Sequence, residues 1–271
     1  MIKMSKKMRT NITLFISLFF CFVSFSFAQL RIYPEGQNVI ASPGATIKGN
    51  IWVIGADKKL EVEIQPEDWS KGERKSGVDW LKIKLKSNKF TLKPKKIKEI
   101  KWEVKVPKEA EGDLVAQIFF ASVGMKFGSV NIGTRVAYSL CITVKGTEKV
   151  DAEISNFYIR QESKNYGFAV VFKNKGNVHL TTKGEILLKH LQTGSTKQLE
   201  LHPWLYRCGE SFPLWSWLYN EELPKGNYES TAVVYFTDPT GIERNIKSII
   251  TFNINETGEI TEIKPTKQNV P

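Results

Sequence analysis

The sequence contains few residues of the kinds and spacings that carry enzyme chemistry. Its three histidines are His179, His190 and His202, and they form no His-x-x-x-His pair. The sequence also has no Cys-x-x-Cys pair, no glycine-rich phosphate loop and no Gly-x-Ser-x-Gly turn. A glycosidase-type carboxylate pair that meets only in space would leave no such pattern and stays an alternative. We therefore expect a non-enzymatic protein with no catalytic residues, no metal site and no cofactor.

The segment Asn174-Lys-Gly-Asn-Val-His179 is typical of a turn. Gly176 and Asn177 are residue types that accept a positive φ, and we expect the His179 side chain to hydrogen-bond the backbone of a neighbouring loop. Asp113 also adjoins turn signals, where carboxylates commonly cap turns. A metal role for His179 would need more ligands than the sequence offers nearby.

Aromatic residues are concentrated between His202 and Tyr219, where three tryptophans and two tyrosines fall within eighteen residues. The simplest interpretation is that at least two of Phe212, Trp215 and Trp217 fill a core or a domain junction. The alternative is an exposed platform for a glycan or a protein partner. The candidate residues of this aromatic patch are Trp204, Tyr206, Trp215 and Trp217.

The N-terminus has the pattern of a signal peptide. Four basic residues precede an apolar run over 12–27, and Ser26 and Ala28 provide the small side chains that signal peptidase requires. We expect cleavage after Ala28, export to the periplasm or cell surface, and no membrane span in the mature chain. A retained membrane anchor is one alternative. A lipoprotein signal at Cys21 is another, although Phe20 stands where a small residue is preferred.

The chain is basic, with a formal net charge of +11, of which four charges belong to the first 28 residues. The densest lysines lie in 82–101 and mostly alternate with apolar residues. This pattern favours the solvated face of strands and the protection of a sheet edge. A site for anionic surface polymers is the alternative. The charge forms no block typical of nucleic-acid binding, so we expect no nucleic-acid partner.

Beyond the signal peptide, the chain alternates short apolar and polar segments with turn signals, which indicates an all-β fold. About seven short strands in the first half fit one immunoglobulin-like sandwich over 29–146. The same pattern repeats over 150–254 and indicates a second sandwich, and 255–271 is expected to be a flexible tail. The two cysteines of the mature chain, Cys141 and Cys208, then fall in different domains. We expect buried or half-buried thiols, with an interdomain disulfide left open.

The clearest strand is 130–144, in which apolar residues occupy one parity over most of its length. At about 3.3 Å per residue it would extend roughly 45 Å, which is more than a small sandwich needs. Part of this strand is therefore a candidate edge for pairing with a partner. The candidate partner-binding residues are Arg135, Val136, Tyr138, Leu140 and Ile142.

Several motifs carry a resemblance to known families. In the first half these are Pro43-Gly44, Trp80-Leu, Phe90-x-Leu-x-Pro94, and Val106-Pro-x-x-Ala-x-Gly112 followed by a strand ending Ile118-Phe-Phe120. They resemble the first domain of PapD-like pilus chaperones and of WxL-interacting bacterial surface proteins. The Asn174 to His179 turn, followed by Gly184, resembles a turn in the C-terminal domain of the WxL-interacting family.

The resemblance to pilus chaperones implies a protein that donates its long final first-domain strand to an incomplete subunit and anchors the subunit's carboxylate with basic residues. Arg135 stands where the basic residue on that strand is expected, whereas 33–38 offers no basic partner. WxL-interacting proteins normally end in a membrane-spanning helix, which 261–271 does not resemble.

These observations favour a non-catalytic binding protein of the periplasm or cell surface. The leading hypothesis is a chaperone-like or adaptor protein that holds a β-protein, such as a pilus-type subunit, by strand pairing. The alternative is a surface-attachment module that binds peptidoglycan or another glycan.

Overall fold

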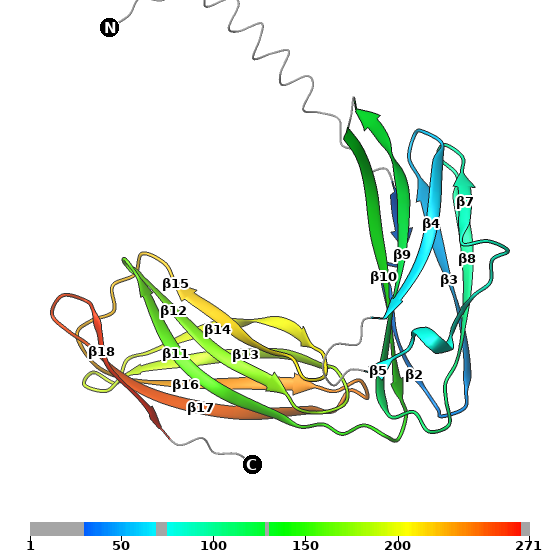
Figure 1. Ribbon diagram of the computed structural model, residues 1–271. Coiled ribbons are helices and arrows are strands. Elements are labelled where there is room, and N and C mark those ends of the chain that lie inside the picture. The colour runs from blue at the N-terminus through cyan, green and yellow to red at the C-terminus, as the bar shows by residue number, and fades with distance from the viewer. Residues whose placement is uncertain (1–29, 69–74, 128–129, 267–271) are drawn as a thin grey trace, which may run out of the picture.

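The computed structural model describes residues 30–68, 75–127 and 130–266, and in these ranges it consists of β-strands, their connections and one 3₁₀ turn, η1 (Val78–Trp80). The strands form two β-sandwich domains that meet at an angle, so the molecule is L-shaped (Figure 1). The predicted all-β fold with two tandem sandwiches is confirmed. The predicted signal peptide lies outside the described residues. In the described part of the chain, no helix is both long and apolar enough to cross a membrane.

The first domain packs two sheets face to face. One sheet has the strand order β1 (Leu30–Tyr33), β3 (Thr46–Gly55), β8 (Ile97–Lys105) and β6 (Leu81–Ile83). The other has the order β2 (Gly36–Ala41), β10 (Val130–Val144), β9 (Gly112–Phe127), β4 (Leu60–Asp68) and β7 (Lys89–Leu92), and the short β5 (Lys75–Ser76) also pairs with β9. Neighbouring strands are antiparallel except for the parallel pairs β2–β10 and β5–β9.

The core of the first domain lies between these sheets because each strand turns its apolar parity inward. Trp102 of β8, Phe120 of β9 and Tyr138 of β10 are its largest members, and at most 1% of each is exposed. Burying a large apolar side chain of this kind contributes roughly 1.5–3 kcal/mol. The long β9–β10 hairpin is thus fixed to the domain by the side chains along one of its faces.

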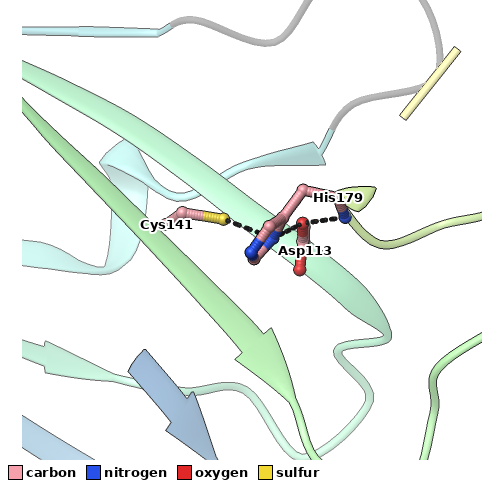
Figure 2. A group of neighbouring side chains, drawn as sticks. All are labelled: Asp113, Cys141 and His179. Atoms are coloured by element: carbon pink, nitrogen blue, oxygen red, sulfur yellow. Dashed lines mark hydrogen bonds and ion pairs between the residues drawn. The ribbon is translucent and has the colours of Figure 1, made fainter. Parts of the chain in front are cut away.

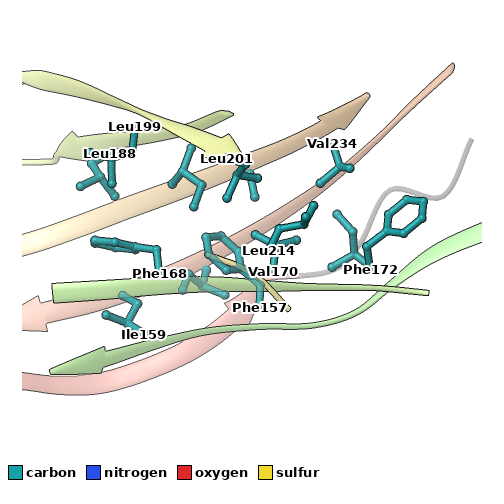
Figure 3. Close-up of a cluster of buried hydrophobic side chains, with 14 of the residues drawn as sticks. Phe157, Ile159, Phe168, Val170, Phe172, Leu188, Leu199, Leu201, Leu214 and Val234 are labelled. Carbon is teal, nitrogen blue, oxygen red and sulfur yellow. The ribbon is translucent and has the colours of Figure 1, made fainter. Parts of the chain in front are cut away.

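The second domain is also built from two sheets. One contains β11 (Ala152–Glu162), β12 (Asn165–Asn174) and β15 (Ser211–Leu218). The other has the order β14 (Thr196–Tyr206), β13 (Leu180–His190), β16 (Gly226–Thr237), β17 (Glu243–Ile254) and β18 (Ile260–Thr266). Figure 3 shows the core between them, where Phe168 and Phe172 of β12 face Leu188, Leu201 and Val234 of the opposite sheet.

The C-terminal segment differs from its prediction. Residues 255–271 were expected to form a flexible tail, but β18 adds an edge strand beside β17. Side chains from the opposite sheet hold the turn before it: the Gln161 amide and the Tyr166 hydroxyl donate to the Gly258 carbonyl, and Gln161 accepts from the Ile260 N–H. The polar composition of this segment suggested that it is loose. The residues that hold it lie about a hundred positions earlier in the chain, so no local pattern indicates the contact.

Candidate functional site

The β9–β10 hairpin presents one incomplete sheet edge. Strand β2 pairs with β10 only from Ser139 to Val144, and in the described chain no strand pairs with this side of β10 before Ser139. The view in Figure 1 places β10 along the inner side of the angle between the domains. The N-terminal half of β10 is therefore an unpaired edge, and it lies toward the end of the first domain that points away from the second domain (Figure 1).

The backbone groups on this edge can be assigned from the pairing of β2. The Ser139 N–H donates to the Glu35 carbonyl and the Lys145 N–H donates to the Ala41 carbonyl, so odd-numbered residues of β10 direct their backbone groups away from β9. Because this direction alternates along a strand, Arg135 and Ala137 turn their N–H and C=O groups toward the unpaired side. We call this segment, Thr134 to Tyr138, the free edge of β10.

The structure places the predicted partner-binding side chains differently from the prediction. Tyr138, Leu140 and Ile142 are buried in the first domain's own core, and Val136 is half-buried against it. Their apolar parity was correctly identified, but it completes this sandwich, and so these three side chains are not free to contact a partner. What remains accessible is the backbone of the free edge.

Arg135 lies on the outer face of the sheet and already has partners. Its guanidinium forms an ion pair with Glu67 of β4, and its Cζ lies 3.6 Å from the centroid of the Phe119 ring. A guanidinium over an aromatic face is a favourable cation–π arrangement. Arg135 is half-exposed in this arrangement, so a cationic group flanks the free edge.

The turn from Asn174 to His179 forms the contact between the two domains. Within the turn, the Asn174 side-chain amide donates to the carbonyls of Val178 and Tyr206, and its oxygen accepts from the Gly176 N–H. Toward the first domain and the connection, the Asn177 carbonyl accepts from the Asp113 N–H and the Asn177 side chain bonds the backbone of Thr147 and Lys149.

The glycine in this turn has a different role from the one predicted. Neither Gly176 nor Asn177 has a positive φ. A Cβ on Gly176 would instead lie 2.3 Å from the Lys149 carbonyl oxygen. Glycine is needed here because the backbone of the turn packs directly against the interdomain connection.

His179 bonds a side chain of the first domain. The Asp113 carboxylate accepts from the His179 backbone N–H at 2.6 Å, and its Oδ2 lies 2.7 Å from His179 Nδ1. The Thr143 hydroxyl donates to the other oxygen at 2.6 Å. The Cys141 Sγ lies 3.6 Å from the same ring nitrogen (Figure 2). The loop-backbone partner predicted for His179 is therefore replaced by a buried carboxylate.

The electrostatics of this cluster follow from burial and hydrogen bonding. Burial alone would raise the pKa of Asp113, but the bonds from His179 and Thr143 outweigh it and lower that pKa. Burial and the neighbouring Asp113 carboxylate raise the pKa of the Cys141 thiol well above its usual range. Asp113 is therefore an ionised acceptor, and Cys141 is a neutral thiol and not an activated nucleophile.

The two cysteines are buried to the extent that the sequence predicted. Cys141 is half-buried and Cys208 is buried, and neither forms a disulfide.

The predicted aromatic patch is divided between the two sheets of the second domain. Trp204 is 58% exposed on β14, whereas Tyr206 is fully buried in the core with its hydroxyl donating to the Phe212 carbonyl. Trp215 and Trp217 lie on β15, in the other sheet. The chain crosses from one sheet to the other through 207–210, which separates these residues. They therefore do not form the single patch predicted.

The expectation that at least two of Phe212, Trp215 and Trp217 fill a core or a domain junction is not met, since Phe212 is exposed and the two tryptophans are only half-buried on the outer face. Leu214, Ser216 and Leu218 of β15 face inward instead, and Phe212 is 48% exposed. Trp215, Trp217 and Tyr219 stack along the outer face, with ring centroids 5.4 and 6.0 Å apart and interplanar angles of 15° and 18°. We call these three residues the aromatic row.

Small residues on β12 make room for the aromatic row. Trp215 and Trp217 pair in register with Ala169 and Gly167, and a Cβ on Gly167 would lie 2.7 Å from the Trp217 ring. Tyr158 of β11 meets Trp215 edge-on at 5.7 Å. In the described chain β15 is an edge strand of its sheet, so the row borders a second unpaired edge.

Several lysines of the 82–101 segment form ion pairs on strand faces. Lys84 contacts Glu103 at 2.6 Å and Lys101 contacts Glu99 at 3.6 Å. These exposed pairs fit the interpretation of a solvated strand face.

No model of a known protein family matches the sequence, and no curated protein is significantly similar to it. Solved structures with a similar fold include the YadV chaperone, at 12% identity and a TM-score of 0.45 over 81% of this chain and 99% of that one. The class 5 fimbriae chaperone CfaA has 14% identity and a TM-score of 0.45 over 82% and 98%. The CsuC–CsuE chaperone–tip adhesion subunit pre-assembly complex of Acinetobacter baumannii has 12% identity and a TM-score of 0.40 over 81% and 98%.

Proposed function

We propose that this protein is an exported, non-catalytic binding protein that holds a protein partner by strand pairing at the free edge of β10. In this role it is a chaperone-like or adaptor protein for surface or pilus-type β-proteins. The observation that carries the proposal is the long β10 strand, which β2 covers only from Ser139 onward. The signal-peptide pattern of the first 28 residues supports a location in the periplasm or at the cell surface.

The free edge supplies the main-chain groups for such pairing. Arg135 and Ala137 each offer an outward N–H and C=O, so an added strand gains backbone hydrogen bonds worth about 0.5–1.5 kcal/mol each. Affinity of this kind tolerates variation in the partner's sequence because the backbone makes the contacts.

Side chains beside the edge would supply selectivity. Val136 is half-buried on the core side, so an apolar residue of the added strand could pack against it. Arg135 on the outer face would favour an acidic or carboxylate group on the partner, which would then compete with Glu67. An alternating strand with a nearby carboxylate is the partner that this edge fits best.

The test substitutes proline at position 137. Ala137→Pro removes an outward N–H and leaves the ladder between β10 and β9 in place, because that N–H does not point toward β9. Tagged wild-type and variant proteins are purified from the native envelope at low and high salt, and bound proteins are identified by mass spectrometry. We expect a β-protein to stay bound to the wild type at high salt and to be absent from the variant.

Hydrogen exchange then locates the contact. Adding the identified partner should slow amide exchange at Arg135 and Ala137 and leave the exposed β18 amides unchanged. Ile97→Ala, an exposed apolar substitution on β8, serves as the control that keeps partner binding. Equal capture by the wild type and a folded Ala137→Pro protein would exclude the free edge as the binding site.

A second candidate function is attachment to a surface glycan, and the aromatic row favours it. Rings that stack along an edge strand, with Trp215 and Trp217 half-buried and Tyr219 exposed, suit the apolar faces of sugars. Retention of the protein on purified cell wall at low salt is compared with retention of Trp217→Ala and of Trp204→Ala, an exposed tryptophan on the other sheet. Loss of retention only in Trp217→Ala supports attachment through the row, and equal retention of all three proteins counts against it.

A further inference from the structure

Three side chains with metal-ligating atoms converge at the domain junction. They are Asp113 at the start of β9, Cys141 near the end of β10 and His179 of the second domain. One ligand atom from each lies within 4.8 Å of the others. Figure 2 shows the Cys141 sulfur and the Asp113 carboxylate both directed toward the His179 ring.

The separations approach those of a tetrahedral metal site. With metal–sulfur and metal–nitrogen bonds of about 2.3 and 2.0–2.1 Å, tetrahedral ligands lie about 3.6 Å apart. The distance from Cys141 Sγ to His179 Nδ1 is 3.6 Å. The Nδ1 to Asp113 Oδ2 distance of 2.7 Å is that of a hydrogen bond. A metal ion in place of the bridging proton would widen it to about 3.3 Å, a shift of the carboxylate by roughly half an ångström.

The surroundings leave room for a fourth ligand. A cavity of about 60 Å³ adjoins the cluster and is lined in part by Cys141, His179 and Arg207. About 10–15 Å³ of such space is enough to hold a water molecule, so this cavity accommodates one. Arg207 contributes a positive charge, which the two negative charges of a thiolate and a carboxylate outweigh.

We propose that Asp113, Cys141 and His179 bind one divalent transition-metal ion, with Zn²⁺ the best match, and that this ion joins the two domains. A thiolate, an imidazole and a carboxylate together select zinc-like ions over Mg²⁺ or Ca²⁺, which prefer oxygen ligands. Binding replaces the thiol proton of Cys141 and the Nδ1 proton of His179 with the metal. The imidazole then carries its proton on Nε2, so a neutral ring keeps its charge and the thiol proton is the net proton released to solvent. The ion would fix the angle between the sandwiches, because two of its ligands belong to one domain and the third to the other.

The structure also explains why the sequence predicted no metal site. His179 lies 38 residues from Cys141 and 66 from Asp113, so the ligands share no motif. The three ligands meet only because the turn formed by residues 174–179 packs against β9 and β10.

Cobalt provides the test because thiolate–Co²⁺ bonds absorb in the near ultraviolet. The purified, untagged protein, held reduced by a phosphine, is titrated with Co²⁺ and then with Zn²⁺. We expect a charge-transfer band that saturates at one equivalent of Co²⁺ and disappears as Zn²⁺ displaces it. Absence of the band in the wild-type protein overturns the proposal.

Matched variants assign the ligands. Even outer-shell substitutions change metal affinity about 10–100-fold, so His179→Gln and Asp113→Asn should weaken Co²⁺ binding at least about tenfold. Cys141→Ser should lose the charge-transfer band, and Cys208→Ser should keep it. Circular dichroism checks the folding of each variant. A band that persists in Cys141→Ser, or that is lost in Cys208→Ser alone, would place the cobalt at another thiol and contradict the site.

Discussion

The Asp113 carboxylate accepts hydrogen bonds from both the backbone N–H and the ring of His179, so a strand of the first domain is bonded twice to one residue of the second. Both side chains are nearly buried, with at most 10% exposed. A buried carboxylate without partners would be strongly unfavourable, so the pair makes separation of the domains costly. The angle between the sandwiches thus depends on a polar contact as well as on the covalent connection.

This contact predicts coupling between two substitutions. In metal-free protein, His179→Gln should lower the free energy of unfolding by about 1–3 kcal/mol, because it leaves the Asp113 carboxylate short of a partner. Asp113→Asn should have a similar effect. In the double variant the losses should be less than additive, since each removes the same interaction. Denaturant unfolding of the four proteins measures the coupling.

Asp57→Asn is the matched control, because Asp57 is 83% exposed and its ion pair with Lys95 lies on the surface. Its effect should stay within about 0.5 kcal/mol. Strict additivity of the Asp113 and His179 effects would show that the two residues act independently.

The ionisation of Asp238 is expected to make the stability of the second domain depend on pH. Burial alone would raise the pKa of this carboxyl, but hydrogen bonds from Thr240, Arg244 and the Ile242 backbone outweigh it and lower the pKa. The stabilisation is therefore complete above the unfolded pKa of about 3.9 and is lost as the pH falls through the lower folded pKa. Asp238→Asn should reduce stability at pH 7 by about 1–3 kcal/mol.

The difference between wild type and Asp238→Asn should shrink as the solution is acidified below pH ~4. Thermal unfolding from pH 7 to pH ~2.5 follows it. A difference that remains constant over this range would mean that the Asp238 charge contributes nothing and that only the shape of the loop matters.

Replacing Gly49 of β3 by alanine is expected to create a packing defect. A Cβ at this position would lie 2.3 Å from Trp102 Cζ2, and Trp102 is buried in the first core. Gly49→Ala should cost about 1–3 kcal/mol because the indole or the strand must move. Gly77→Ala is the control, since its new Cβ would lie 3.5 Å from the Val115 carbonyl oxygen, an ordinary van der Waals distance. Urea unfolding compares them, and equal stability of the two variants would contradict the close contact.

The Gln161 side chain is expected to attach the C-terminal strand β18 to the rest of the domain. Its amide group bonds both the Gly258 carbonyl and the Ile260 N–H, and so Gln161→Ala should loosen β18 without unfolding the domain. Limited proteolysis should cleave the 258–266 segment faster in this variant. Gln198→Ala, at an exposed glutamine of β14, should leave the cleavage rate unchanged. Equal rates in both variants would mean that backbone pairing with β17 alone holds β18.

Much of the architecture could be predicted from local pattern. The alternation in 130–144 identified a strand with one apolar face, and β10 has those bounds. Alternation in 167–174 and 228–236 likewise predicts strands, and β12 and β16 cover these ranges, because their apolar residues recur with the period of two that a pleated strand imposes. It missed β15, because the aromatic residues of that strand lie on its outer face and its inner face includes a serine.

Alternation fixes which residues share a face, but not what covers that face. The sequence by itself determined most of the long strands, the two sandwiches and the apolar parity of β10, since these depend on neighbours in the chain. The tertiary structure decided that Tyr138, Leu140 and Ile142 are core, that the backbone edge beside Arg135 is free, and that the aromatic patch is divided between two sheets. It also brought Asp113, Cys141 and His179 together. Such contacts join distant segments, and their geometry follows from how the sheets pack and where β2 stops.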